Sequence, residues 1–432
     1  MLHHEKWRNN HDKLKHGRCM CECAIHTREK THNWFGEKKY RLANFFDQWW
    51  DIYCQDPKHF ISPEQYKAVA DMRACRTAAL GIDNYSCPQC GDITEVFHNC
   101  KNRFCPTCSW SDTMRWAERI KNNMFNMPHR HVVFTIPHAL NPLIKRNEYE
   151  LLNMQMKVSA GTLKDWMENK YGLRCGIISV LHTAGELKTF HSHVHMILSW
   201  GGIDKLGIIQ KIKGPFVKYE FISDKFRKEY EARLTELFDN GKLQHDFSDK
   251  AEFLRFLGRI NDKHWIINFE DPIDTPVEVI RYIGRYSKRA CLSEYKITQM
   301  EGEIIGFSYK DYKSKDFFGH PMEKEKTLNF RDFFPLLLQH VPLPYFRLVR
   351  YYGIYSNKGH LPKEYFTHSE DTPVNWKAIQ ESETGEDPMI CQKCKIDKVY
   401  THTIVQRRTG LHKIIRDKLM DDSSFRSRRA FV

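Results

Sequence analysis

The spacing of apolar residues predicts a helical first part of the chain and a strand-rich second part. Within 40–79, Leu42, Phe46 and Trp50 recur at four-residue steps, as apolar residues do on one face of an amphipathic helix. A cysteine-rich loop follows, and then a short helix is predicted near 112–122. We expect these helices to pack their apolar faces on a core.

Two helix starts carry a recognisable cap. Ser62 is followed by Pro63 and Thr275 by Pro276, and a glutamine or a glutamate stands three positions after each hydroxyl residue. The hydroxyl accepts a hydrogen bond from the backbone, the longer side chain bonds back to the cap, and proline suits the first turn. The sequence therefore predicts helices that begin at these two caps.

After residue 130 the apolar residues fall into short runs. The run from His131 to Ile136 is rich in β-branched residues and closes at Pro137, which is typical of a buried strand. The same reasoning predicts strands at 131–136, 176–181, 192–200 and 304–311. Longer stretches in which apolar residues keep helical spacing predict helices at 147–170 and 329–352. The sequence thus belongs to the α+β class.

Length and composition shifts suggest an order of domains. The chain has 432 residues, which leaves room for two or three domains of about 150 residues each. We expect a basic extension at 1–40 and a helical and cysteine-rich module at 41–122. A strand-rich core at 123–352 and a polar tail at 353–432 should follow.

Charge and hydropathy narrow the choice of partners. Lysine and arginine number 67 against 54 acidic residues, and the net charge of +13 attracts polyanions, above all nucleic acid. Aromatic residues make up 13 %, enough for a core and for rings that stack on bases. No apolar run is long enough to span a bilayer, and the first residues lack a secretory signal. We therefore expect an intracellular protein that binds nucleic acid and no membrane.

Fourteen cysteines in a reducing compartment indicate metal binding rather than disulfides. Cys87 and Cys90 form one CxxC pair, and Cys105 and Cys108 form another after 14 intervening residues. Two such turns supply the four thiolates of a tetrahedral zinc site, which leaves no open coordination position. The sequence predicts one structural zinc ribbon that uses all four cysteines.

The loop of this predicted ribbon holds further candidate residues. His98 and Cys100 are alternative zinc ligands, although their spacing requires an unusual geometry. Lys101 and Arg103 make the loop basic, so we predict that it also contacts DNA. A third CxxC pair near the end of the chain has no partner pair downstream; for this pair, Cys391 and Cys394, a second zinc site completed by His402 and His412 is an open alternative.

His193 and His195 are the centre of the predicted catalytic site. Side chains alternate along a strand, so both imidazoles face one side and form half of a divalent metal site. Glu186, seven residues earlier and across a predicted turn, is the expected third ligand, with His182 and His191 in reserve. Three ligands leave positions for a phosphate oxygen, as Lewis-acid catalysis requires.

Tyr282 and Tyr286 are the candidate nucleophiles. Residues four apart on a helix share one face, so the two phenols lie one turn from each other. The basic residues beside them stabilise a phenolate and hold a phosphate; they are Arg285, Lys288 and Arg289. A tyrosine that attacks a phosphodiester leaves a 5′-phosphotyrosine and a free 3′-hydroxyl, and a second tyrosine permits a second cleavage.

These residues resemble the two-tyrosine HUH transposases of the insertion sequence 91 family over roughly 40–359. The resemblance rests on seven segments in one order, which are CRTAALG, CPQCGDI…CKNRFCPTC, HVVFTIPHALN, VLHTAGELKTFHSHVHMILSWGG, RYIGRYSKR, FSYKDYK and QHVPLPYFRLVRYYGIYSN. It implies an HUH endonuclease core, a mainly antiparallel sheet flanked by helices, preceded by a helical and zinc-ribbon module. It also implies Mg²⁺ or Mn²⁺ at His193 and His195, with Tyr282 and Tyr286 as nucleophiles.

The resemblance implies a bacterial, rolling-circle-like transposase that acts on single-stranded DNA at transposon ends and target sites. The chain lacks a GxxxxGK[ST] phosphate loop, so we expect a host helicase to unwind the DNA. Two positions depart from the family pattern: Glu186 stands where glutamine is frequent, and Ser192 where proline is usual.

Two other functions remain open from the sequence. A plasmid replication initiator or relaxase shares the same chemistry, but the zinc ribbon ahead of the core favours a transposase. A non-catalytic zinc-ribbon DNA-binding regulator accounts for the charge and the zinc, yet gives no reason for paired histidines and paired tyrosines in one chain.

Overall fold

The computed structural model describes residues 40–121, 123–214, 219–261, 265–273, 290–356, 389–406 and 412–415, with a few single positions between 361 and 387. The basic extension, the helix predicted from Thr275 and most of the polar tail lie outside these residues. The described part is a mixed α+β structure with antiparallel sheets, as predicted. None of the helices in these ranges is long and apolar enough to cross a membrane.

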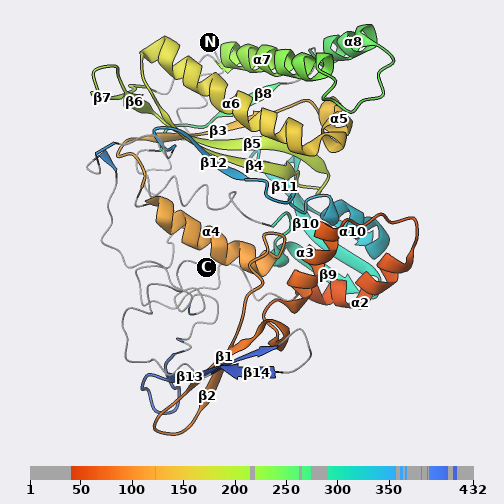
Figure 1. Cartoon of the computed structure of the whole chain (residues 1–432), viewed down its shortest axis with the longest axis vertical. Coiled ribbons are helices and arrows are strands. Elements are labelled where there is room, and N and C mark those ends of the chain that lie inside the picture. The colour runs from red at the N-terminus through yellow and green to blue at the C-terminus, as the bar shows by residue number, and fades with distance from the viewer. Residues whose placement is uncertain are drawn as a thin grey trace.

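A five-stranded sheet forms the centre of the upper half of the molecule in Figure 1. Its order is β12-β4-β5-β3-β8, and every neighbouring pair is antiparallel. The strands are β3 (His129–Thr135), β4 (Gly176–Ala184), β5 (Phe190–Ser199), β8 (Ile266–Phe269) and β12 (Val349–Gly353). The strands predicted at 131–136, 176–181 and 192–200 are therefore confirmed, and the last of them, β5, is the middle strand.

Helices cover both faces of this sheet. α6 (Glu148–Tyr171) and α7 (Tyr219–Asp239) lie on one face (Figure 1), with α5 (Asn141–Arg146) and α8 (Lys250–Asn261) near them. Val194 and Met196 of β5 point into this side and share one apolar core with both long helices. α4 (Pro106–Lys121) lies on the opposite side of the sheet in Figure 1. A two-stranded ribbon, β6 (Gly201–Ile203) with β7 (Ile209–Lys211), extends from the end of β5.

A second core joins the first helices to a later part of the chain. The first helices are α2 (Leu42–Gln55) and α3 (Pro63–Ala74), and the later elements are β9 (Ile297–Glu301), β10 (Ile304–Lys315), β11 (Pro321–Asn329) and α10 (Phe330–Leu338). Phe46 stacks on Phe334 with ring centroids 4.2 Å apart, and Trp49 stacks on Phe330 at 5.1 Å. The predicted cap of α3 is confirmed, because Ser62 and Gln65 exchange both hydrogen bonds.

A four-stranded sheet, at the opposite end of the molecule from α6 and α7 in Figure 1, has the order β14-β13-β1-β2. It consists of β1 (Ile82–Ser86), β2 (Ile93–Phe97), β13 (Val399–Gln406) and β14 (His412–Ile415). The sequence predicted only a loop in the first half of this region. Its strands are short and mostly half-exposed, so their residues carry little of the apolar pattern on which a strand prediction depends.

The helix predicted over 329–352 is wrong in its second half. The helix α10 ends at Leu338, and residues 349–353 form strand β12. Pro342 and Pro344 explain the break, because proline lacks the N–H that a helix needs and disfavours helical geometry in the residue before it. The helix predicted near 112–122 is also longer than expected, since α4 begins at Pro106.

Candidate metal centres

The two histidines of the predicted metal pair lie on the middle strand of the five-stranded sheet. His193 and His195 of β5 face the side of the sheet opposite to Val194 and Met196, because side chains alternate along the strand. On the neighbouring strand β4, His182 is the direct partner of His193 across the ladder. Directly paired residues point to the same face, so all three imidazoles share one side of the sheet.

These three imidazoles are close enough to share one ion. One nitrogen from each of His182, His193 and His195 lies within 4.8 Å of the other two. The ring centroids of His182 and His195 are 4.5 Å apart, and those of His193 and His195 are 4.9 Å apart. We name this group the histidine cluster. The protein ligands of a catalytic ion commonly number three, which leaves coordination positions for substrate.

The hydrogen bonds of His193 fix its protonation. Its Nδ1 lies 2.8 Å from the backbone carbonyl oxygen of His191, and a carbonyl only accepts, so Nδ1 carries the proton. The other ring nitrogen, Nε2, therefore keeps its lone pair. Burial lowers the pKa of His193 to about 3 and the pKa of His195 well below its ordinary value, so both rings are neutral at pH 7. Neutral imidazole is the form that binds metal.

His131 and Glu270, which are not members of the histidine cluster, orient the ring of His195. The Nδ1 atom of His195 lies 2.8 Å from Nε2 of His131 on β3, and Nδ1 of His131 lies 3.1 Å from Oε1 of Glu270. The carboxylate favours a proton on Nδ1 of His131, which makes Nε2 of that ring an acceptor for the Nδ1–H of His195. This chain of contacts orients the ring of His195, in the manner of the carboxylate–histidine pairs that orient metal ligands. The sequence analysis did not identify either residue.

The expected third ligand, Glu186, is not part of the histidine cluster, and this prediction is corrected. Its Oε2 atom lies 3.0 Å from Nζ of Lys296 and accepts a hydrogen bond of 3.2 Å from the backbone N–H of Lys310. The ladder between β4 and β5 shifts register between His182 and Ala184, just before the turn that holds Glu186. The carboxylate thus ties this turn to β10, and His182 takes the third position instead.

The other reserve ligand, His191, lies outside the cluster as well. Its ring stacks on that of His138 with centroids 4.4 Å apart, and burial lowers its pKa to about 4. Ser192, the position that departs from the family pattern, is fully buried and donates a hydrogen bond to Oε1 of Gln155 on α6. The serine therefore holds β5 against α6, on the face opposite to the histidine cluster.

Helix α4 packs on the histidine-bearing face of the sheet. Trp116 and Ile120 of α4 contact Ile178 and Ile197, which lie further along β4 and β5 on the same face as the histidines. The indole Nε1 of Trp116 also donates to the hydroxyl of Tyr351 on β12, at 3.0 Å. This contact fixes α4 beside the site.

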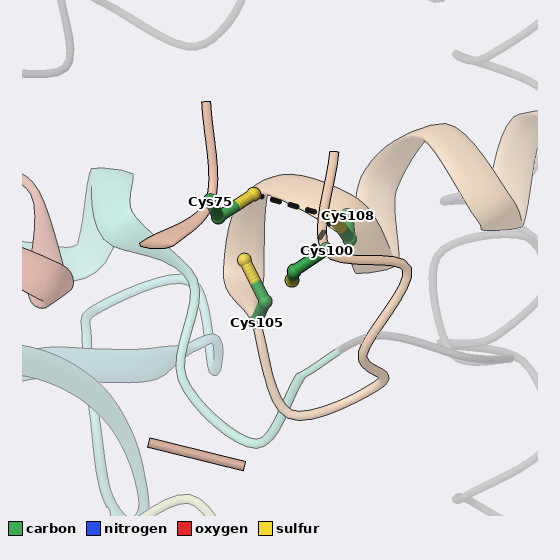
Figure 2. A group of neighbouring side chains, drawn as sticks. All are labelled: Cys75, Cys100, Cys105 and Cys108. Atoms are coloured by element: carbon green, nitrogen blue, oxygen red, sulfur yellow. Dashed lines mark hydrogen bonds between the residues drawn. The ribbon is translucent and has the colours of Figure 1, made fainter. Parts of the chain in front are cut away.

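The first turn of α4 carries the second metal centre. Figure 2 shows Cys105 and Cys108 at the start of this helix, with Cys75 and Cys100 directed toward them from the end of α3 and from the loop after β2. The four sulfur atoms lie within 4.8 Å of one another. We name this group the buried cluster, since three of its cysteines are buried. The Cys108 sulfur is 3.5 Å from those of both Cys75 and Cys100.

A second group of four cysteines lies at the end of the four-stranded sheet that contains β1 and β13. Its members, which we name the ribbon cluster, are Cys87, Cys90, Cys391 and Cys394. The sulfur atoms of Cys90 and Cys391 are 3.6 Å apart, although 301 positions separate these residues in the sequence. The ribbon cluster is more open than the buried cluster, with one exposed and one half-buried cysteine.

The prediction of one zinc site from Cys87, Cys90, Cys105 and Cys108 is therefore wrong. Each CxxC pair belongs to a different cluster, because β1 and β2 carry the first pair away from α4. Cys100, an alternative ligand in the sequence analysis, is a member of the buried cluster. His98 is not, because its Nδ1 contacts the carbonyl oxygen of Leu80 at 3.2 Å.

Cys75 is the ligand candidate that sequence reasoning missed. Cys75 and Cys100 are each followed by a basic residue with a left-handed backbone: the φ angles are 57° for both Arg76 and Lys101. Such a turn lets the chain reverse around the sulfur. The repeated Cys-basic pair is a pattern that could have joined these two cysteines in advance.

The remaining predicted site residues fall into two groups. Lys101 and Arg103 are exposed in the loop of the buried cluster. Tyr282, Tyr286, Arg285, Lys288 and Arg289 lie outside the described residues. The described chain before them ends at Ile273, which pairs with His129 at the beginning of β3.

Comparison with known proteins identifies the family. A family model described as "Transposase zinc-binding domain" matches residues 45–136, and one described as "Putative transposase" matches 176–362. The "Putative transposase y4qJ" of Sinorhizobium fredii is 30% identical over 308 residues, which cover 69% of this chain and 76% of that protein. The chain belongs to the insertion sequence 91 family of transposases.

A more distant relative agrees with this assignment. The transposase is 26% identical to the "Transposase for insertion sequence element IS801" of Pseudomonas savastanoi pv. phaseolicola over 360 residues, 79% of this chain and 84% of that protein. No solved structure matches. The zinc-binding match includes the buried cluster and the first pair of the ribbon cluster, whereas Cys391 and Cys394 lie beyond both matched ranges.

Proposed function

We propose that this transposase nicks and rejoins single-stranded DNA through 5′-phosphotyrosine intermediates in rolling-circle-like transposition. The histidine cluster is the observation that carries the proposal. Three imidazoles share one face of adjacent strands, and those of His193 and His195 have their proton-bearing nitrogens turned toward acceptors. A structural role for buried histidines does not require one ring nitrogen from each of three residues to converge within 4.8 Å.

The proposed core is an HUH endonuclease fold. Its support is a five-stranded antiparallel sheet with the paired histidines on the middle strand and long helices on the opposite face. We assign the core to 123–352 and the helical and zinc-binding module to 41–122. The latter includes the matched zinc-binding domain at 45–136 only in part.

A divalent ion fits the histidine cluster. Mn²⁺ suits these ligands better than Mg²⁺, because Mg²⁺ prefers an octahedron of oxygens whereas Mn²⁺ binds nitrogen ligands more readily. When bound, the ion polarises a non-bridging oxygen of the scissile phosphate. His182, His193 and His195 would hold it, and Glu270 would orient the last of them through His131.

In the proposed reaction Tyr282 or Tyr286 supplies the nucleophile. The phenol gives up its proton and its oxygen forms a bond to phosphorus, while the bond between phosphorus and the 3′ oxygen breaks. The departing oxygen takes up a proton as a 3′-hydroxyl, and the 5′ phosphate stays on the tyrosine. The attack of a 3′-hydroxyl on this phosphotyrosine reverses the step and joins two strands. Arg285, Lys288 and Arg289 are proposed to hold the phosphate.

The remaining parts of the proposal concern DNA and its handling. The buried cluster is assigned a structural zinc ion, because four thiolates fill a tetrahedral shell. The exposed Lys101 and Arg103 beside it are proposed to contact the DNA backbone. Transposon ends and target DNA are the expected substrates. A host helicase is proposed to supply the single strand.

The proposal is tested by a nicking assay on labelled single-stranded DNA from the element's end with Mn²⁺. The variants are His193→Ala, Tyr282→Phe, Tyr286→Phe and the double phenylalanine variant, and Glu186→Gln is the matched control. We expect wild type and the control to form a covalent protein–DNA adduct. Loss of His193 should reduce it by more than about 100-fold, as expected for a ligand of a catalytic ion.

Adduct formation should persist in at least one single tyrosine variant and disappear in the double variant. Cleavage that survives in the double variant contradicts the proposed nucleophiles. Tight DNA binding without cleavage in wild type, with Mn²⁺ or Mg²⁺, would instead support a non-catalytic DNA-binding role.

A further inference from the structure

The ribbon cluster joins two parts of the chain that neither matched family range contains together. Cys87 and Cys90 follow β1, and Cys391 and Cys394 precede β13. We propose that these four cysteines hold a second zinc ion, which ties the C-terminal strands of the transposase to its zinc-binding domain. This proposal does not depend on the tyrosine chemistry.

The two cysteine turns have the same backbone geometry. In each turn, the residue after the second cysteine donates its N–H to the carbonyl of the first cysteine, at 2.9 Å from Gly91 and 2.8 Å from Lys395. In each turn, the N–H of the first cysteine donates at 2.9 Å to the carbonyl five positions later. Gly91 and Lys395 both have a left-handed backbone, with φ of 71° and 58°. Two matched turns that face each other present four sulfur atoms to one ion.

The left-handed backbone φ angle of Lys395 supports the metal site. A residue with a side chain adopts this conformation at an energetic cost, and such strain persists only where the surrounding structure requires it. Here it lets the chain reverse directly after Cys394, so that both cysteines of the pair point inward. The same reversal in the first turn uses a glycine, for which the conformation costs little.

The sulfur separations fit zinc and do not fit disulfides. The Cys90 and Cys391 sulfur atoms are 3.6 Å apart, far from the bond length of about 2.05 Å. A tetrahedral zinc ion with bonds of about 2.3 Å places its sulfur ligands roughly 3.8 Å from one another. Four thiolates with no oxygen ligand select a soft tetrahedral ion rather than Mg²⁺.

Strand pairing also connects the C-terminal strands to the zinc-binding domain. β13 pairs antiparallel with β1 from Ile82↔Ile404 to Ser86↔Val399, so that β1 has a neighbour on each side. The Lys398 ammonium is buried and donates to Asp92 at 2.7 Å and to Thr94 at 2.6 Å. The C-terminal strands are thus an integral part of the domain.

The two cysteine clusters differ in what they hold together. The buried cluster connects α3 with α4, which are near in the sequence, and lies against the second apolar core. The ribbon cluster closes a chain loop of about three hundred residues, and its four cysteines belong to none of the apolar cores formed by the described residues. The zinc ion of the ribbon cluster therefore carries a larger share of the stability of its sheet, because metal-binding free energy becomes folding free energy where a core is small.

The proposal is tested by the zinc content of the purified full chain, measured by inductively coupled plasma mass spectrometry. We expect two zinc ions per wild-type chain and one in each double variant, Cys87→Ser with Cys90→Ser and Cys391→Ser with Cys394→Ser. The variant that combines all four changes should still hold one, because both pairs serve the same ion. Cys54→Ser, at a half-buried cysteine outside both clusters, is the control and should hold two.

Two zinc ions in the Cys391→Ser, Cys394→Ser variant overturn the proposal, as does the loss of a further ion when the four changes are combined. Limited trypsin digestion adds a readout that does not depend on stoichiometry. Cleavage after Lys398 should be slow in wild type, where its side chain is buried, and at least about tenfold faster after chelation or in either double variant. Equal cleavage rates in zinc-loaded and zinc-free protein contradict the proposed connection.

Discussion

At the level of single residues, the direction of each histidine lone pair follows from the partner of the other ring nitrogen. His193 donates to a backbone carbonyl, and His195 is linked through His131 to Glu270. These contacts keep the two rings in one orientation before any ion binds. Preorganised ligands bind a metal more tightly, because they lose less conformational freedom when it arrives.

Loss of His182 should remove metal binding, whereas loss of the Glu186 charge should not. We expect His182→Ala to weaken Mn²⁺ binding by more than about 100-fold, since it removes one of three ligands. Glu186→Gln should change the affinity by less than about threefold, because its carboxylate contacts Lys296 and Lys310 instead of the ion. Isothermal titration with Mn²⁺ measures both. The opposite ranking would restore Glu186 as the ligand.

Removal of the Glu270 charge should act through His131 on the metal. Glu270→Gln is expected to weaken Mn²⁺ binding by about 10- to 100-fold, as do other changes at residues that orient a ligand. The melting temperature without metal should shift little, because the carboxylate is partly exposed. Titration with Mn²⁺ and thermal unfolding without it separate the two effects. An unchanged affinity would mean that the contact with His131 does not orient His195.

Part of this site could be predicted from the sequence. The pairing of His193 with His195 follows from strand periodicity, which is a local property. The choice of His182 over Glu186 depends on the register shift between β4 and β5 near His182, and no local pattern encodes it. Glu270 reaches the site because its backbone N–H bonds to the carbonyl of His131, a contact between residues 139 positions apart in the chain.

At the level of elements, helix α4 connects the buried cluster to the sheet that carries the histidine cluster. Cys105 and Cys108 anchor its first turn, and Trp116 and Ile120 pack beside the histidines. A zinc ion held by these cysteines would therefore fix the position of a helix whose later residues pack on the face that carries the histidine cluster. The sequence predicted the Cys105–Cys108 pair as zinc ligands and a helix near 112–122. It did not predict that the cysteine pair stands at the start of that same helix.

Truncation of Trp116 tests the packing of α4. Trp116→Ala is expected to lower the free energy of unfolding by about 3–5 kcal/mol, because the side chain is 3% exposed and leaves a cavity against Ile178 and Ile197. Ile52→Ala, at a residue that is 46% exposed on α2, should change it by no more than about 0.5 kcal/mol. Urea denaturation measures both values. Similar losses in the two variants would contradict the assigned packing.

At the level of the whole molecule, the fold brings together segments that are far apart in the chain. The first helices share a core with residues 292–338, and the last strands complete a sheet with β1 and β2. Periodicity predicts most single elements, because it depends on neighbouring residues. It gives no information on which elements pair at long range, and for this reason the four central cysteines were assigned to one site instead of two.

Buried neutral histidines should make the metal-free protein sensitive to acid. Burial lowers the pKa of both His129 and His193 to about 3, so below pH 6.5 the unfolded chain takes up protons that the folded chain does not. Stability is then complete above pH 6.5 and falls as the pH decreases, by about 1.4 kcal/mol per pH unit for each histidine. Urea denaturation between pH 7 and pH 5 measures this slope.

His129→Gln should flatten the pH dependence, because it removes one of the two buried rings. Identical urea midpoints at pH 7 and pH 5 in the wild-type protein would contradict the buried, neutral state of these rings.

The most direct test of the account is the identity of the residue that carries the DNA. The transposase is incubated with Mn²⁺ and single-stranded DNA from the element's end, the adduct is digested with nuclease and trypsin, and the peptides are sequenced by mass spectrometry. Trypsin cleaves after Arg281, Arg285 and Lys288, so the two tyrosines fall in separate peptides, YIGR and YSK. The account predicts a 5′-phosphonucleotide on Tyr282 or Tyr286. A nucleotide attached to any other residue, or cleavage with no attached nucleotide, would contradict it.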